Sequence, residues 1–196
     1  MSSLPLLIVA SAALLHLLRH YLSNRVHENV ISSVPFSGKI SQAGDTVVAV
    51  REAAKEGSQN HKTIVCFPGF LETSSYFLDL YGALDCELIF VNNANYHSPF
   101  ASANIESLAW PTNPYQSGSI EYDGFHLALA VKNFASYEQV VLHGHSRGGA
   151  VVLDAGRQFP DITNDSARNI TAVLEAAVLP QAKAAGGTPG PIRAAL

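Results

Sequence analysis

Short apolar runs that alternate with helical stretches set the strongest limit on how this chain folds. Three runs, Thr63–Phe67, Glu87–Asn92 and Val140–His143, lack the polar–apolar alternation of a half-exposed strand. Runs of this kind are typical of strands buried on both faces. Ile170–Glu175 follows as a fourth strand. Between the strands, apolar side chains recur at helical spacing, as in Ser119–Phe134. The alternation predicts an α/β fold, in which helices cover both faces of a mostly parallel sheet.

A hairpin is expected before these strand–helix units. Val30–Ile40 and Thr46–Arg51 are separated by the turn-rich link Ser41–Asp45, which predicts two antiparallel strands. We expect this hairpin at one edge of the sheet. Two further helices are predicted, Ser74–Leu84 and Arg147–Phe159, the second of them ended by Pro160.

Composition excludes several classes of protein. Of the 196 residues, 47% are hydrophobic and only 14% are charged, the opposite of a disordered chain. The net charge is −4 and no basic run occurs, so nucleic acid is not an expected partner. Cys66 and Cys86 are too few for a disulfide framework or a zinc site, and we expect them at opposite ends of neighbouring strands. We therefore expect no metal and no cofactor.

The N-terminal stretch Leu4–Leu18 carries no charge. As a helix it would span about 22 Å, less than the roughly 30 Å hydrocarbon core of a bilayer. Three interpretations remain open: a membrane anchor, a buried helix of the domain, and a signal peptide. The anchor is favoured because Arg19, His20 and Arg25 follow directly, as an interfacial collar would. Two arginines on the C-terminal side alone favour a cytoplasmic location for the rest of the protein.

The sequence thus predicts three parts. Residues 1–25 form the N-terminal anchor helix, residues 29–181 form the α/β core, and residues 182–196 form a tail rich in Ala, Gly and Pro. A peripheral association of the N-terminal helix with the membrane is the alternative to a single pass.

A G-x-S-x-G motif carries the chemistry. Gly144-His145-Ser146-Arg147-Gly148 follows one apolar strand and opens a helix, the setting of a nucleophile elbow. There the serine sits on a strained turn with its hydroxyl exposed, and the positions two before and two after it must lack bulk. Both are glycine here. The sequence therefore predicts Ser146 as a nucleophile.

A second element supports the motif. Pro68-Gly69-Phe70 ends the earlier strand Thr63–Phe67. On its own, Pro68-Gly69 is a plain turn. Beside an elbow, this turn supplies one backbone N–H of an oxyanion hole, and the residue after the serine supplies the other. The predicted donors are the backbone N–H groups of Phe70 and Arg147.

With these two motifs the chain resembles the α/β-hydrolase family over about residues 30–180. The resemblance implies an eight-stranded sheet and a catalytic Ser, acid and His in that chain order. It points to a hydrolase of carboxylic esters, similar to esterases and lipases, with a thioesterase on the same scaffold as an alternative. A serine in the elbow argues against the dehalogenase and epoxide hydrolase branches, which use Asp there.

The sequence departs from the family pattern after the elbow. No histidine follows His145, so the family's general base has no counterpart. Glu175, at the end of the fourth strand, is the candidate acid. The simplest expectation is the N-terminal part of a longer hydrolase, with a sheet incomplete at the C-terminus and weak or no activity alone. A non-catalytic binding or scaffold protein that keeps the fold is the rival interpretation.

The stretch Asn92–Gly118 is long and irregular, so it is either functional or a surface excursion. Phe100, Trp110 and Tyr115 either line an acyl pocket or simply pack. His97 is expected to be a surface or pocket-lining group and His126 a helix residue. We expect no histidine side chain within about 3.2 Å of the Ser146 hydroxyl, the reach that a general base needs.

Overall fold

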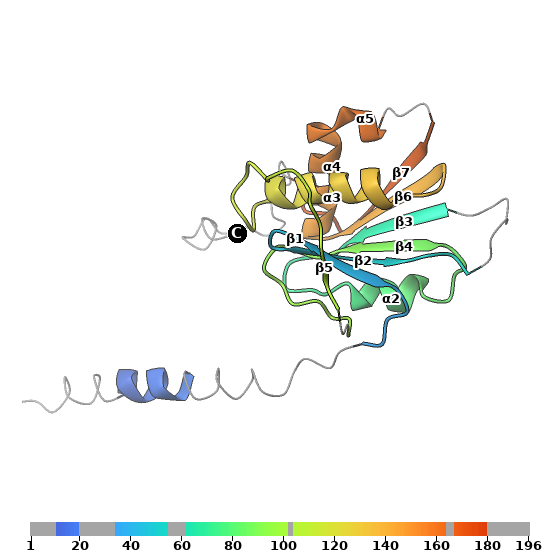
Figure 1. The fold of residues 1–196 in the computed structure, drawn as a ribbon. Helices are drawn as coiled ribbons and strands as arrows, with labels where there is room; N and C mark the ends of the chain where they lie inside the picture. The colour runs from blue at the N-terminus through green and yellow to red at the C-terminus, as the bar shows by residue number, and fades with distance from the viewer. Residues whose placement is uncertain (1–10, 20–33, 55–61, 102–103, 164–166, 180–196) are drawn as a thin grey trace, which may run out of the picture. The chain divides into compact units, whose positions relative to one another are not determined.

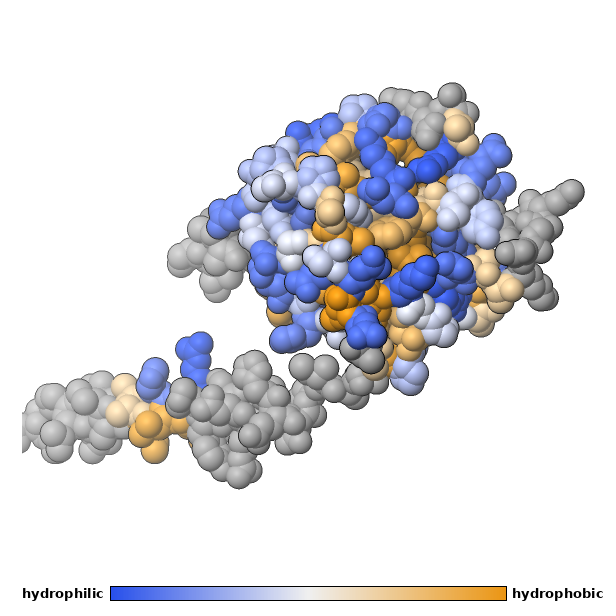
Figure 2. Space-filling view, viewed as in Figure 1, coloured by the Kyte–Doolittle hydropathy of each residue, from blue (hydrophilic) through white to orange (hydrophobic). Residues whose placement is uncertain are grey.

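The computed structural model describes residues 11–19, 34–54, 62–101, 104–163 and 167–179. The chain divides into two compact units, residues 1–34 and 35–196, and each is described by itself. In the first unit, residues 11–19 are helical and expose leucines such as Leu14 and Leu15. Figure 2 shows apolar side chains on one side of this helix and hydrophilic ones on the other.

The membrane anchor remains a prediction, because residues 4–10 and 20–25 lie outside the described residues. Within the described ranges, no helix combines the length and the apolar character that crossing a bilayer requires.

The second unit is built on a seven-stranded sheet in the order β5-β1-β2-β4-β3-β6-β7 (Figure 1). The pairs β3–β4, β3–β6, β6–β7 and β1–β5 are parallel, and β1–β2 and β2–β4 are antiparallel. The predicted α/β fold with a mostly parallel sheet is therefore confirmed. The strands are β1 Lys39–Ala43, β2 Thr46–Arg51, β3 Lys62–Phe67, β4 Glu87–Val91, β5 Glu106–Ser107, β6 Gln139–His145 and β7 Asn169–Glu175.

The apolar runs form strands because the core encloses them. Every residue of β4 is buried, and β3 is buried from Thr63 to Phe67. The predicted boundaries of these two strands, and of β6 and β7, are right to within about two residues. β7 lies at the sheet edge, so most of its side chains are exposed.

The hairpin prediction needs two corrections. Its first strand is Lys39–Ala43, not Val30–Ile40, so part of the expected link Ser41–Asp45 is strand. These polar residues become strand because they pair with Thr46–Arg51 in register, which overrides their preference for turns. The hairpin is also not at the edge, because β5, from within the long stretch Asn92–Gly118, pairs with β1 on its outer side.

Helices cover both faces of the sheet (Figure 1). The helix α2 (Ser75–Tyr81) lies on one face, while α3 (Ile120–Phe134) and α4 (Arg147–Gln158) pack together on the other. Side chains along β6 alternate between these faces, since successive residues of a strand point in opposite directions. Leu142 packs into the core with α3 and α4, whereas His143 meets Phe77 of α2 at a ring-centroid distance of 5.0 Å.

The helix α2 is shorter than the predicted Ser74–Leu84, because Gly82 caps its end. Pro160 does end the preceding helix, and it also begins the short helix α5 (Pro160–Thr163). Proline suits the first turn of a helix, where its missing N–H would have no partner.

Candidate active site

Ser146 occupies a strained backbone position between β6 and α4. Its φ is 52° and its ψ is −116°, a conformation that L residues rarely adopt. The two motif glycines make this turn possible. A Cβ on Gly144 would lie 2.3 Å from the carbonyl oxygen of Gly148, and a Cβ on Gly148 would lie 2.1 Å from that of Phe67. Any side chain at either position would collide with backbone.

The turn that follows β3 lies directly against the elbow. A Cβ built on Gly69 would be 3.1 Å from the Cβ of Ser146. The backbone of Ser146 is also held by the last residue of β7 and by the segment after it. Its N–H donates to the carbonyl oxygen of Glu175 at 2.8 Å, and its own carbonyl oxygen accepts from the N–H of Val178 at 3.0 Å. The position of Ser146 is thus fixed by the ends of the two neighbouring strands β6 and β7.

Most N–H groups of this turn, which we call the oxyanion turn (residues 68–72), already have acceptors. Gly69 donates to Glu72 Oε2 at 2.9 Å, Leu71 to the Tyr96 hydroxyl at 3.2 Å, and Glu72 to the Gly69 carbonyl at 3.4 Å. Among the hydrogen bonds between described residues, the N–H of Phe70 takes part in none. The role of Phe70 as an oxyanion donor stays a prediction.

Arg147, the second predicted donor, is the first residue of α4, a position where the backbone N–H has no intrahelical partner. Its guanidinium turns away into a polar network. Nη1 donates to Asp123 Oδ2 at 2.6 Å and to Asn93 Oδ1 at 2.5 Å, and Nη2 donates to the Gly118 carbonyl at 2.9 Å. Burial raises the pKa of the fully enclosed Asp123 carboxyl, and the Arg147 charge opposes that rise.

The sequence motif gives a role only to the backbone of Arg147. Its side chain, however, ties α4 to α3 and to both ends of the long loop. The available signal was Asp123, a carboxylate set among the apolar positions of Ser119–Phe134.

The two histidines of the elbow strand point to the α2 face. His143 Nδ1 shares a 2.7 Å hydrogen bond with the Tyr81 hydroxyl, and its Nε2 lies 3.0 Å from Glu175 Oε2. Burial lowers the pKa of His143, and the Glu175 carboxylate acts in the opposite direction. His145 Nδ1 lies 2.6 Å from Glu72 Oε2. Both rings are committed to partners on that face.

The other described candidates lie elsewhere. His126 is buried against β2, where its Nδ1 shares a 2.8 Å hydrogen bond with Thr46 Oγ1, and burial lowers its pKa to about 4. His97 is exposed. None of the hydrogen bonds among the described residues reaches the Ser146 hydroxyl.

Glu175, the predicted acid, binds residues of the α2 face. In addition to His143, it accepts a 2.8 Å hydrogen bond from the Tyr76 hydroxyl through Oε1. Its role as the acid of a catalytic triad stays a prediction.

The aromatic residues named above in the long loop contact other aromatic rings. Phe100 stacks on Phe36 with ring centroids 4.5 Å apart and meets Phe90 of β4 at 5.3 Å. Trp110 is packed against the core beside α3. Tyr115 approaches Phe125 of α3 at 6.5 Å.

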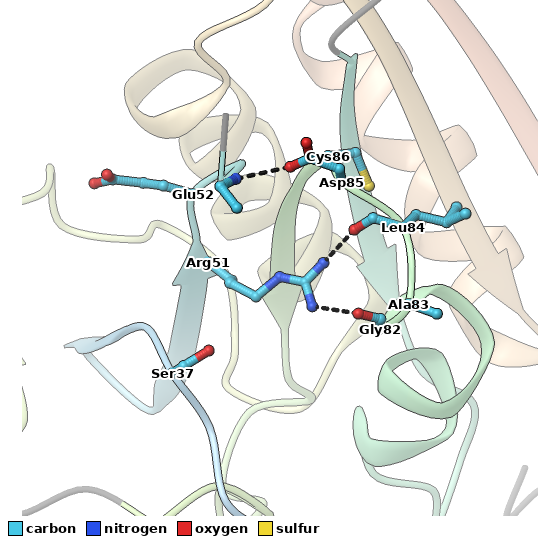
Figure 3. A pocket seen from close by; sticks show the side chains of 9 residues that line it. Ser37, Arg51, Glu52, Gly82, Ala83, Leu84, Asp85 and Cys86 are labelled. Atoms are coloured by element: carbon cyan, nitrogen blue, oxygen red, sulfur yellow. Dashed lines mark hydrogen bonds between the residues drawn. The ribbon is translucent and has the colours of Figure 1, made fainter. Parts of the chain in front are cut away.

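A separate hollow of about 560 Å³ lies near the amino end of β4, away from the elbow (Figure 3). Arg51 crosses it and donates to the carbonyl oxygens of Gly82 and Leu84 at 2.7 and 2.8 Å. Its guanidinium thereby satisfies backbone carbonyls of the segment that follows α2. Cys86 borders the hollow, and both cysteines are buried free thiols. Cys66 lies near the end of β3 and Cys86 directly before β4, at opposite ends of neighbouring strands as expected.

Three features identify the fold. They are the order of the strands in the sheet, the strained serine after β6, and the turn after β3 that lies against it. The fold is that of the α/β hydrolases. No protein-family model matches the sequence, and no curated protein matches it significantly.

Several solved structures are similar to the chain. A membrane phospholipase A has 19% identity and a TM-score of 0.48, over 92% of this chain and 53% of that one. An α/β-hydrolase fold protein of unknown function has 13% identity and a TM-score of 0.44, over 72% and 44%. The α/β hydrolase domain-containing protein 10 from mouse has 16% identity and a TM-score of 0.39, over 64% and 46%. The chain thus spans about half the length of these structures.

Proposed function

We propose that this protein is a serine hydrolase that acts on a carboxylic ester, with Ser146 as its nucleophile. The conformation of Ser146 carries the proposal. A non-glycine residue at φ 52° costs on the order of 1–3 kcal/mol. Packing alone would be served better by glycine at that position. Serine is favoured over glycine at this strained position only if the function requires a hydroxyl exposed above the sheet.

In this proposal the Ser146 Oγ attacks the carbonyl carbon of the ester. The C–O bond to the alcohol breaks, the alcohol leaves with a proton, and the acyl group stays on Ser146 until water hydrolyses it. The N–H groups of Phe70 and Arg147 stabilise the negative oxygen of the tetrahedral intermediate. The assignment is supported by the turn that carries Phe70, which lies against Ser146, and by the place of Arg147 as the first residue of α4.

The proton of Ser146 needs an acceptor. His126, His143 and His145 are hydrogen-bonded to other residues, and His97 is exposed in the long loop, so we assign this step to none of these histidines. Glu175 remains the proposed acid. Without a positioned base, the remaining oxyanion and binding effects give a rate of about 10³–10⁴ over water in well-studied triad enzymes. We therefore expect the 196-residue chain to hydrolyse esters slowly.

We further propose that residues 4–18 associate with a membrane and that the domain lies on its cytoplasmic side. The uncharged stretch and the basic residues after it support this proposal.

Imidazole added to the solution can take the place of the base and so tests the proposal. Hydrolysis of p-nitrophenyl butyrate is measured with rising imidazole for the wild type and for Ser146→Ala, after subtraction of the protein-free rate. We expect the hydrolysis rate to rise in proportion to the imidazole concentration, with a slope about tenfold larger for the wild type than for Ser146→Ala. This gain is a fraction of the acceleration that a positioned base provides. Equal terms in the two proteins would reject the serine hydrolase and favour the non-catalytic scaffold.

A further inference from the structure

We propose that Glu72 is a positioning residue of this site. It ties the oxyanion turn to the nucleophile elbow and so fixes the direction of the Phe70 N–H. The inference rests on the proposed function, because it assigns a task to Glu72 in the same reaction.

A single carboxylate oxygen bridges the two parts of the site. Glu72 Oε2 accepts a hydrogen bond from the N–H of Gly69 at 2.9 Å, within the oxyanion turn. The same oxygen lies 2.6 Å from Nδ1 of His145, the residue directly before Ser146. Gly69 directly precedes the predicted donor Phe70, and His145 lies two residues before the predicted donor Arg147. The carboxylate therefore sets the distance between the turn and the elbow.

The turn needs such a restraint because its own backbone is strained. Leu71 has a φ of 61°, which is unfavourable for a bulky residue, and its side chain is exposed, so packing does not hold it. Two further bonds steady the turn from the loop after β4. Asn93 Nδ2 donates to the Gly69 carbonyl at 2.9 Å, and Tyr96 accepts from Leu71. Asn93 also accepts a hydrogen bond from Arg147 of α4, and Glu72 adds a second connection, to His145 of the elbow.

Gly69 is fitted to this arrangement. A Cβ at position 69 would lie 2.6 Å from Glu72 Oε2 as well as 3.1 Å from the Ser146 Cβ. A larger residue would push the carboxylate away. The absence of a side chain at Gly69 is what lets Glu72 fold back over the turn and reach His145.

The position of the Phe70 N–H matters because an oxyanion donor works at about 2.7–3.1 Å from the developing charge. Loss of one such donor costs about 10²–10³ in rate. If Glu72 is removed, Gly69 loses its acceptor and the strained turn can relax. The N–H of Phe70 then no longer points at the substrate oxygen.

Two substitutions separate the hydrogen bonds from the charge. Glu72→Gln keeps an oxygen that can accept from Gly69 and His145, whereas Glu72→Ala removes it. Asp79→Ala is the matched control, since Asp79 is an exposed acidic residue of the neighbouring helix α2. The readout is the second-order rate at which a fluorophosphonate reacts with Ser146 in the full chain, followed by intact mass.

We expect Glu72→Ala to react about 100-fold more slowly, Glu72→Gln within about threefold of the wild type, and Asp79→Ala unchanged. Hydrogen exchange of a peptide covering residues 68–74 should be faster in Glu72→Ala but not in Glu72→Gln. If circular dichroism shows that Glu72→Ala is unfolded, Glu72→Asp replaces it. Its shorter side chain cannot reach both partners, and it should react at least tenfold more slowly.

A wild-type rate in Glu72→Ala would overturn the proposal. So would a Glu72→Gln variant as slow as Glu72→Ala, because the charge and not the hydrogen bonds would then matter. If the wild type itself does not react, the proposed function fails. The exchange rates alone then decide whether Glu72 holds the turn.

Discussion

Ser146 keeps its conformation only because glycines surround it. The closest approach involves Gly148, where a Cβ would lie 2.1 Å from the backbone oxygen of Phe67. Backbone atoms of a central strand cannot give way as the end of a flexible side chain can. The conformation of Ser146 therefore depends on the space next to the end of β3 that Gly148 leaves free.

We predict that Gly148→Ala lowers the free energy of unfolding by about 3 kcal/mol, as overpacking does in a close-packed interior. Gly118→Asn is the control. Gly118 also has a positive φ, 85°, but a Cβ there meets nothing within 4 Å, and asparagine tolerates such backbone angles. Urea unfolding of both variants measures the difference. Two equally stable variants would contradict the steric account of the elbow.

At the scale of elements, His126 links α3 to β2. The ring is buried, and its pKa of about 4 lies below the ordinary value of 6.5. Between these two pH values the unfolded chain binds the proton and the folded protein does not. Stability therefore rises with pH across this window and is lost as the pH falls from about 6.5 to about 4.

We predict that this histidine contributes about 2 kcal/mol to the acid loss of stability. His126→Gln can keep a hydrogen bond to Thr46 but cannot titrate, so its stability should change less between pH 7 and pH 4.5. The exposed His97→Gln should behave like the wild type. Urea unfolding at several pH values gives the slopes. An unchanged slope in His126→Gln would show that the buried ring is not the source.

Some elements and site residues could be predicted from the sequence, and others could not, for physical reasons. β3, β4 and β6 are apolar enough that burial decides their structure. β1 and β5 carry polar residues, and they become strands only because a partner lies alongside. The elbow is a local motif, so Ser146 was visible in the sequence. The Glu72–His145 pair joins residues 73 positions apart, a distance that no local pattern covers.

At the scale of the whole molecule, the proposed association of the N-terminal stretch with a membrane can be tested by deletion. We predict that the full chain sediments with membranes, and that removal of the first 25 residues or so moves it to the soluble fraction. A deletion of residues 182–196 serves as the control and should stay with the membranes. If the full chain is soluble without detergent, the buried-helix interpretation of Leu4–Leu18 is correct.

The central claim is that Ser146 is the nucleophile of a hydrolytic site. Peptide mapping by mass spectrometry after prolonged reaction with a fluorophosphonate tests it most directly, with Ser75→Ala, an accessible serine of α2, as the control variant. The account predicts one adduct, on the peptide that contains Ser146, present in Ser75→Ala and absent in Ser146→Ala. An adduct on another residue, or equal modification of Ser146→Ala, would contradict it.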